Sequence, residues 1–235
     1  MKSNRIIRSL ALASLVSVAL YVARALTFSS TEFWYLNWNL LLAWVPLIFS
    51  YMLVRHCITG FWVSTKGILL TILWLLFLPN SFYLATDFIH LQRSTSESLL
   101  FDIVLLLSYT FNGFIVGYLS VYSVHQLLLR RMARRKSHLL VAGVFLLCSF
   151  AIYLGRYLRW NSWDIIFNPA GILFDVSDRF LNPADHEQTF WTTALFFVLI
   201  SSVYMVLWSL LREVQLASVS KAVRQPALPR RGRTR

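Results

Sequence analysis

The sequence predicts an all-α membrane protein, a polytopic bundle of about six transmembrane helices with one short interfacial helix near residues 170–182. Three observations predict this class. The chain is 57% hydrophobic and 14% charged, whereas about a quarter of the residues in soluble domains are charged. Six apolar stretches approach or exceed the length of about 20 residues that crosses a bilayer. When the loops are assigned alternately to two sides, the charges separate by sign.

The six predicted spans are residues 9–28, 37–54, 67–89, 98–129, 138–158 and 189–211. The first follows three basic residues, and its apolar core from Leu10 to Val22 also has the length of a signal peptide. We expect this span to be retained, with Arg24 extending outward to the headgroups near Phe28 and Trp34. Cleavage close to Ala25 is the alternative.

The charges predict an orientation. With the amino terminus inside, all but five of the 22 Lys and Arg residues fall on the inner side. Every acidic residue except Glu213 falls on the outer side. Loops rich in Lys and Arg remain cytoplasmic, so we expect an inner (plasma) membrane location with both termini in the cytoplasm. Residues 1–214 are predicted to form one transmembrane domain, and residues 215–235 a basic, disordered cytoplasmic tail.

Composition and motifs leave several function classes without support. The net charge of +12 arises at span ends and in the tail, where basic residues attract anionic lipid headgroups. The lipid bilayer, and not nucleic acid, is therefore the expected partner. Cys57 and Cys148 suggest neither an external disulfide nor a metal-ligand pair. The chain has no G-x-S-x-G and no nucleotide-binding glycine loop, so no cofactor is identified.

The third span carries polar residues at a depth where lipid excludes them. Pro79 lies about 20 Å into the membrane and removes a helix hydrogen bond. Four polar residues then share one stripe of the continuing helix: Asn80, Tyr83, Asp87 and His90. Such groups must face protein or water. A kink whose free carbonyls are satisfied by Asn80 and Ser81 explains part of the stripe, whereas we expect Asp87 to be functional.

The fifth span ends in the polar and aromatic segment GRYLRWNSWD. Arg156 is the deeper of its two arginines, and we predict that it pairs with Asp87, because guanidinium pairs bidentately at low hydration. Arg159 is the second choice, since it lies closer to the headgroups. Asn161 and Asp164 follow in the same polar segment and complete the set of candidate binding residues on this side.

The fourth span contributes Asp102 near its outer end. Together with Asp87 and His90 it would complete either an acid-base set or an oxygen and nitrogen ligand set for a divalent metal. No dense ligand motif such as H-E-x-x-H accompanies it. Deeper in the span, Gly113 and Gly117 have the small-xxx-small spacing that is typical of close helix packing.

Three segments resemble the bacterial membrane proteins grouped as domain-of-unknown-function family 1361. They are LPNSFYLATDFIHL in span three, FDIVLLLSYTFNGFIVGYLS in span four and GRYLRWNSWDII after span five. The resemblance extends from about Asn37 to Trp208. It implies a multi-pass bacterial membrane protein and assigns no catalytic residue, because the family is uncharacterised.

The sequence therefore predicts a polar pocket at the outer ends of spans three, four and five, covered by the 160–188 connection. The candidate catalytic residues are Asp87, His90 and Asp102, and the candidate binding residues are Asn80, Tyr83, Arg156, Arg159, Asn161 and Asp164.

Three functions compete for this pocket. In the first, the protein binds a lipid-linked or anionic envelope substrate and, if it is an enzyme, also modifies it. The arginines would bind the anionic group, and the carboxylates and the histidine would transfer protons. The second is a small transporter with a broken third span. The third is a non-catalytic assembly partner for another membrane protein. A pocket that faces inward favours the first function, and a flat exposed patch favours the third.

Overall fold

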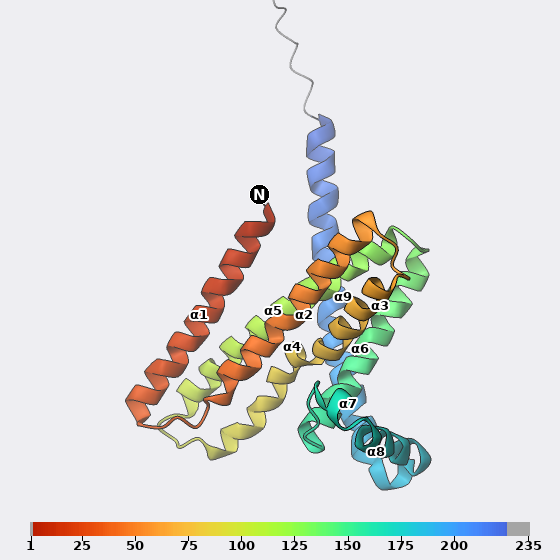
Figure 1. Cartoon of the computed structure of the whole chain (residues 1–235). Coiled ribbons are helices and arrows are strands. Elements are labelled where there is room, and N and C mark those ends of the chain that lie inside the picture. The colour runs from red at the N-terminus through yellow and green to blue at the C-terminus, as the bar shows by residue number, and fades with distance from the viewer. Residues whose placement is uncertain (1, 225–235) are drawn as a thin grey trace, which may run out of the picture.

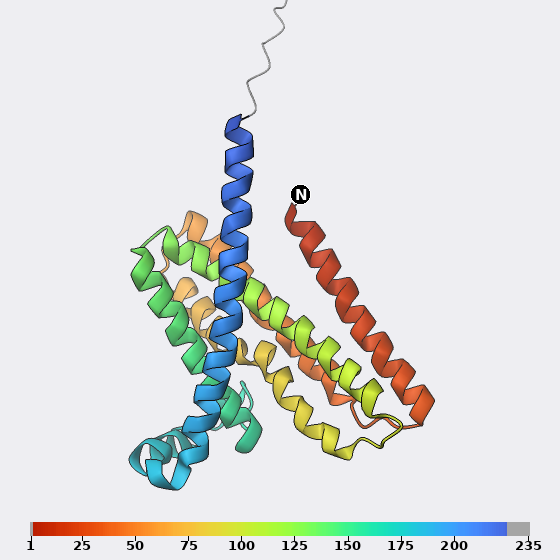
Figure 2. The same ribbon diagram turned by 180° about the vertical axis from the view of Figure 1, so that it is seen from behind.

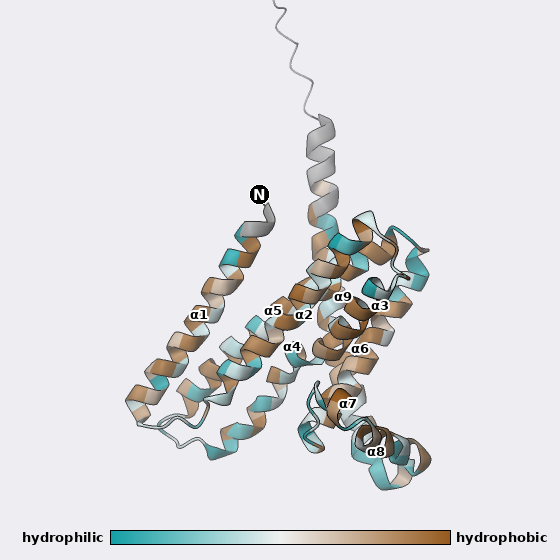
Figure 3. Ribbon diagram, viewed as in Figure 1, coloured by the Kyte–Doolittle hydropathy of each residue, from teal (hydrophilic) through white to brown (hydrophobic). Residues whose placement is uncertain are grey.

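In the part of the chain that the structure describes, six helical segments are long and apolar enough to cross a membrane: Arg5–Phe28, Tyr35–Thr59, Thr65–Arg93, Leu99–Leu129, Arg134–Tyr157 and Pro183–Val214. The computed structural model describes residues 2–224, and within them every regular element is helical. Each segment coincides with one predicted span, to within one residue where the span extends past it, so the prediction of an all-α bundle with six spans is confirmed. Figure 3 shows apolar residues along these helices and polar residues gathered in the connections.

The elements in chain order are α1 (Lys2–Phe28), α2 (Tyr35–Thr59), α3 (Thr65–Phe77), α4 (Pro79–Tyr83), the 3-10 helix η1 (Leu84–Arg93), α5 (Leu99–Leu129), α6 (Arg134–Tyr157), α7 (Asp164–Phe167), α8 (Pro169–Leu181), the 3-10 helix η2 (Pro183–His186) and α9 (Glu187–Arg224). Figure 1 shows the N-terminus and the last turn of α9 at the same end of the molecule. We call the opposite end, which carries the connections 29–34, 94–98 and 158–186, the distal end.

The helix predicted near residues 170–182 is confirmed as α8. Pro169 occupies its first turn, where a missing N–H costs nothing. The Asn168 side chain accepts a hydrogen bond from the Gly171 N–H at 3.1 Å and so caps the helix. Leu173 and Phe174 leave large apolar surfaces exposed, as expected of a helix that lies at a membrane interface.

The helix α9 extends past Glu213 to Arg224, so residues 215–224 are helical and the prediction of a disordered tail is wrong for them. Each residue added to an existing helix gains a hydrogen bond without a new nucleation step, which favours continuation. Residues 225–235, the rest of the predicted tail, lie outside the described residues.

Two apolar clusters hold the bundle together. One joins α2, α3, α4, α5, α6 and α9 around Phe82, Tyr118 and Phe145. The other joins α2, η1 and α5 around Phe33 and Tyr109, with α1 side chains packed against it. The helix α5 contributes to both clusters and contacts α1, α2, α4, η1 and α6. Figure 2, which views the molecule from behind, shows α9 crossing in front of the other helices and α1 at the edge of the bundle.

The third span is broken, as Pro79 predicts. The helix α3 ends at Phe77, α4 begins at Pro79, and the chain then tightens into the 3-10 helix η1 instead of continuing as the α-helix that we expected. A 3-10 helix has three residues per turn, so residues three apart stack on one side. This places Asp87, His90 and Arg93 along one line of η1.

Side chains satisfy the carbonyls near the break. Asn80 donates to the Phe77 carbonyl at 3.0 Å, as expected. Ser162, from the connection after α6, donates to the Leu76 carbonyl at 2.9 Å. Ser81, which we expected to act locally, donates instead to the Ala43 carbonyl of α2 at 2.8 Å. The break is therefore stabilised by neighbouring elements as well as by its own residues.

The two glycines of α5 allow this broken segment to pack closely. A Cβ atom on Gly113 would lie 2.6 Å from the Ser81 carbonyl oxygen and 2.5 Å from a methyl group of Leu84. A Cβ atom on Gly117 would lie 2.7 Å from the Cβ of Ser81. The small-xxx-small spacing therefore serves close packing of α5 against α4 and η1.

Replacement of Gly113 by alanine should lower the free energy of unfolding by about 1–3 kcal/mol, because the added methyl group must displace the backbone of Ser81. Gly143 is the matched control, since a Cβ atom there meets nothing within 4 Å. Gly143→Ala should be neutral or stabilising. Denaturant unfolding in detergent micelles measures both, and equal effects would contradict the close-packing role of Gly113.

Candidate functional site

A cavity of about 610 Å³ lies at the distal end, where α2, the broken third span and α6 meet. Its wall is completed by Trp160, Asn161, Ser162 and Ile165, which follow α6, and by Ile172 of α8. Its charged, amide-bearing and hydroxyl-bearing lining residues are Glu32, Tyr35, Asn39, Asn80, Tyr83, Asp87, His90, Arg93, Arg156, Asn161 and Ser162. The cavity is therefore lined by polar groups from helices that are otherwise apolar.

Asp87 and Arg156 form an ion pair across this cavity. The Arg156 Nη1 lies 3.4 Å from Oδ1 of Asp87, whose side chain is 1% exposed. The second carboxylate oxygen accepts a hydrogen bond from Asn39 Nδ2 at 3.3 Å. The pairing predicted from depth and chemistry is confirmed. Both oxygens of Asp87 are thus engaged, and the carboxylate holds Arg156 in place.

Arg156 also contacts His90, with 3.1 Å between Nη2 and the imidazole Nε2. A guanidinium has donors only, so Nε2 of His90 must accept this hydrogen bond and carries no proton. In the neutral ring the proton then resides on Nδ1. One arginine therefore connects a carboxylate to an unprotonated histidine nitrogen. An anion that took the Arg156 donors would release Nε2 to accept a proton.

A second hollow, of about 600 Å³, shares part of this wall. Tyr83, His90, Arg93, Gly155, Arg156 and Asn161 line both spaces. Only the second is lined by Ile89, Gln92 and Arg159. Three arginines, Arg93, Arg156 and Arg159, therefore surround the second hollow, which gives it the chemistry of an anion site.

Aromatic side chains surround the first cavity. The Tyr35 ring lies 5.2 Å from the His90 ring, and Trp34, Trp38 and Trp160 are among the lining residues. The indole N–H of Trp160 donates to an Asp175 carboxylate oxygen of α8 at 2.7 Å, which ties α8 to the cavity. Such side chains are most stable at the boundary between lipid and water.

Comparison with protein families agrees with the resemblance seen in the sequence. Residues 38–207 match the family described as "Protein of unknown function (DUF1361)". The chain belongs to this family. No curated protein and no solved structure matches the chain. With its six apolar segments, this family member is a multi-pass membrane protein.

The family region contains all nine sequence-predicted site residues, and the structure brings most of them together. Six line the first cavity: Asn80, Tyr83, Asp87, His90, Arg156 and Asn161. Arg159 lines the second hollow. Asp164 lines neither space, because its carboxylate accepts hydrogen bonds from the backbone N–H of Asn161 at 2.7 Å and from the Asn161 amide at 3.2 Å. It shapes the loop that carries Asn161.

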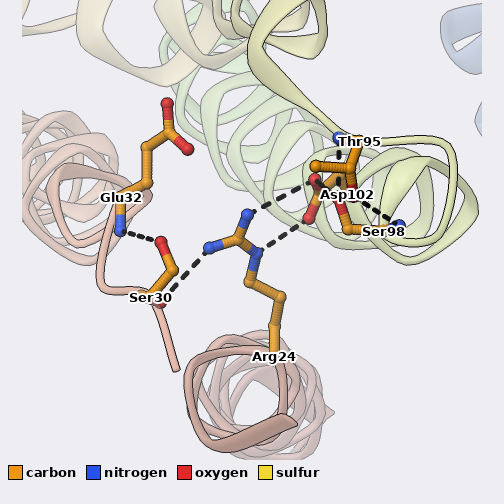
Figure 4. A network of polar contacts seen from close by, with 6 residues as sticks. All are labelled: Arg24, Ser30, Glu32, Thr95, Ser98 and Asp102. Carbon is orange, nitrogen blue, oxygen red and sulfur yellow. Dashed lines mark hydrogen bonds and ion pairs between the residues drawn. The ribbon is translucent and has the colours of Figure 1, made fainter. Parts of the chain in front are cut away.

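Asp102 lies elsewhere, which corrects its placement beside Asp87 and His90. Its carboxylate accepts two hydrogen bonds from Arg24 of α1, at 2.9 Å from Nε and 3.4 Å from Nη2. Ser98 donates to the same carboxylate at 3.0 Å. Both charged side chains are almost fully buried, at 4% and 0% exposure. Figure 4 shows the guanidinium between Asp102 and the Ser30 backbone.

The same network corrects the expectation for Arg24, which does not extend outward to the headgroups. Its guanidinium lies over the Phe33 ring, 4.7 Å from the centroid, and donates to the Ser30 carbonyl at 3.2 Å. The carboxylate of Asp102 supplies a counter-charge inside the bundle, so the arginine has no need to reach water.

The metal hypothesis has no geometric support in the part of the chain that the structure describes. The ligand set required Asp102 beside Asp87 and His90, and the structure separates Asp102 from them. Among the described residues no group of three or more His, Cys, Asp or Glu side chains is placed to hold a metal ion.

The second span contributes residues that sequence reasoning missed. Asn39 binds Asp87, and Tyr35 and Trp38 line the cavity. The predicted pocket used spans three, four and five, whereas the cavity uses the second, third and fifth. A signal was present, since Asn39 is an amide near the outer end of an apolar span and must also face protein or water.

Proposed function

We propose that this protein binds an amphipathic ligand with an anionic group, free or linked to a lipid, in the distal cavity. The observation that carries the proposal is Arg156, held by Asp87 and lining both hollows. A guanidinium has five N–H donors, and two of them face Asp87 and His90. The remaining donors are available to an anion.

The surroundings favour a ligand with an apolar part. Leu42, Leu76, Pro79 and Leu154 line the cavity beside the polar groups, and three tryptophans complete its wall. Ligand sites typically combine an apolar lining with a few placed polar groups. A concave site of this kind supports ligand binding over the assembly-partner alternative, which calls for a flat exposed patch. The break at Pro79 is also compatible with a transporter. The polar residues that follow the break, however, line a cavity at the distal end only, whereas a transporter needs a pathway across the membrane.

The distal end faces outward in this proposal, with both termini in the cytoplasm of a bacterial cell and the bundle in its inner (plasma) membrane. The support is the charge separation, since Arg130, Arg131, Arg134, Arg135 and Lys136 all lie at the opposite end, around the α5–α6 connection. A reporter fused after Arg135 should report the cytoplasm, and one inserted near Asp178 the exterior. An exterior signal from the first fusion would invert the assignment.

If the protein is an enzyme, the proton carrier in this proposal is His90. Its Nε2 is an acceptor beside Arg156, so ligand binding to the arginine would place an unprotonated imidazole next to the anionic group. Asp87 would then be a positioning residue, because both of its oxygens are already engaged.

Binding can be measured through the tryptophans that line the cavity. Purified protein in dodecyl maltoside micelles should lose fluorescence saturably when small amounts of brominated anionic amphiphiles are added, namely brominated phosphatidic acid, phosphatidylglycerol or stearic acid. Brominated phosphatidylcholine should quench only weakly, since its charge is balanced. Trp38→Phe removes one reporter from the cavity wall and should reduce the saturable component. Equal quenching by the anionic amphiphiles and by phosphatidylcholine would rule out the proposed selectivity.

A further inference from the structure

Arg159 has a backbone conformation that arginine rarely adopts. Its φ is 62°, in the left-handed region. The helix α6 ends at Tyr157, and the chain turns back so that the Trp160 N–H donates to the Leu154 carbonyl at 3.2 Å. Helices commonly end through one left-handed residue, and glycine is usual there because it lacks a Cβ atom. An arginine at this position is disfavoured by its backbone.

Nothing that the side chain does for the fold accounts for this choice. Within residues 2–224 the Arg159 guanidinium has no hydrogen-bond or ion-pair partner, and it lines the second hollow. Residues kept in disfavoured conformations gather at functional sites, where the side chain is needed in that place.

Ser29 provides a comparison within the same chain. It is the other non-glycine residue with a positive φ, at 49°, among the described residues. It follows the last residue of α1, and the next N–H, of Ser30, donates back to the Ala25 carbonyl at 3.3 Å. Both Ser29 and Arg159 are exposed. Ser29 lines neither hollow. It therefore has the same left-handed backbone conformation as Arg159 but lies away from the candidate site.

The charges around the second hollow are unbalanced. Arg93, Arg156 and Arg159 line it together with His90. Asp87 is engaged by Arg156 and Asn39, and Glu32 lies 3.8 Å from Arg93 in a solvent-exposed pair, which is worth little. Both carboxylates line the first cavity and not the second hollow. Among residues 2–224, Arg159 therefore has no counter-charge.

We propose that Arg93, Arg156 and Arg159 bind the phosphate group of a phosphate monoester, and that arginine is retained at position 159 for this contact. The inference rests on the proposed function and names the anionic group. A carboxylate presents two oxygens to a single guanidinium fork, whereas a phosphate monoester presents three terminal oxygens and up to two negative charges. The three guanidinium groups that line this hollow therefore match a phosphate monoester better than a carboxylate.

The test replaces Arg159 by glycine, which relieves the backbone while removing the guanidinium. Quenching by brominated phosphatidic acid should weaken about tenfold or more, the loss expected for charge-assisted hydrogen bonds. The thermal midpoint of the variant should equal or exceed that of the wild type. Ser29→Gly should raise the midpoint in the same way and leave binding unchanged. Arg159→Lys keeps the charge without the fork and should bind at an intermediate level.

Two further binding measurements identify the ligand. Brominated stearic acid should bind wild type more weakly than brominated phosphatidic acid, because it lacks the phosphate. Inorganic phosphate at millimolar concentration displaces the lipid if free phosphate is the natural ligand, and fails to do so if the acyl chains contribute. Both results agree with a phosphate site and separate its two sources.

Unchanged binding of phosphatidic acid to Arg159→Gly would overturn the inference, as would equal affinity of the wild type for stearic acid and phosphatidic acid. In both cases the proposed function survives, because an anionic amphiphile still binds. Failure of the proposed function looks different, since no anionic amphiphile then quenches the wild-type protein more than phosphatidylcholine does.

Discussion

Replacement of Asp102 by asparagine should lower the free energy of unfolding by about 3–5 kcal/mol, the cost of stranding one charge of a buried pair. Arg24 and Asp102 are 4% and 0% exposed, and the guanidinium has no route to water without moving α1 away from α5. Unfolding of the purified protein in mixed micelles by increasing mole fractions of SDS measures the effect.

Two variants control this experiment. Replacing both Arg24 and Asp102 by leucine should cost less than the single change, because no charge is left unpaired. Arg93→Leu removes an ion pair whose side chains are 64% and 30% exposed, and should cost less than about 1 kcal/mol. A single Asp102→Asn variant as stable as the wild type would show that α1 does not depend on this pair.

The second large effect concerns the pair in the cavity. Asp87→Asn should lower the free energy of unfolding by about 3 kcal/mol, at the lower end of the range for a broken buried pair. The effect is smaller than for Asp102 because the Arg156 side chain is 16% exposed and its Nη1 lies 3.4 Å from the Asp87 carboxylate oxygen. Arg156→Leu strands Asp87, although Asn39 still donates to it. A double-mutant cycle should give a coupling energy of about 1–3 kcal/mol.

The same two variants should change ligand binding in opposite directions. Asp87→Asn keeps an oxygen that can accept a hydrogen bond from Arg156 and removes a negative charge that repels an anion, so the folded variant should bind brominated phosphatidic acid more tightly. Arg156→Leu removes the donors, so binding should be lost. Quenching titrations on protein that remains folded measure both. Additive stabilities, or weakened binding in both variants, would contradict the geometry of the Asp87–Arg156 pair.

Much of the architecture follows from local features of the chain. A lipid-embedded backbone must satisfy its own hydrogen bonds, so each long apolar stretch is a helix wherever it packs. The break at Pro79 is equally local, since proline removes one of those hydrogen bonds. The pairing of Asp87 with Arg156 could also be predicted, because two opposite charges at similar depth in adjoining polar segments have few other partners.

Features that depend on which helices are neighbours could not be predicted. Asp102 and Asp87 lie on consecutive spans at similar depth, yet one faces Arg24 and the other faces Arg156. The cavity takes Asn39 from the second span, whereas the sequence predicted a contribution from the fourth.

By itself the sequence determined the helices, their order, the break in the third span and the chemistry of the residues at the distal end. Only the tertiary structure decided the pairing of Arg24 with Asp102, the wall that α2 supplies and the left-handed turn that places Arg159 in the second hollow. The physical reason is that hydropathy and proline act within one helix, whereas the choice of neighbours depends on how small residues and side-chain shapes fit across several helices at once.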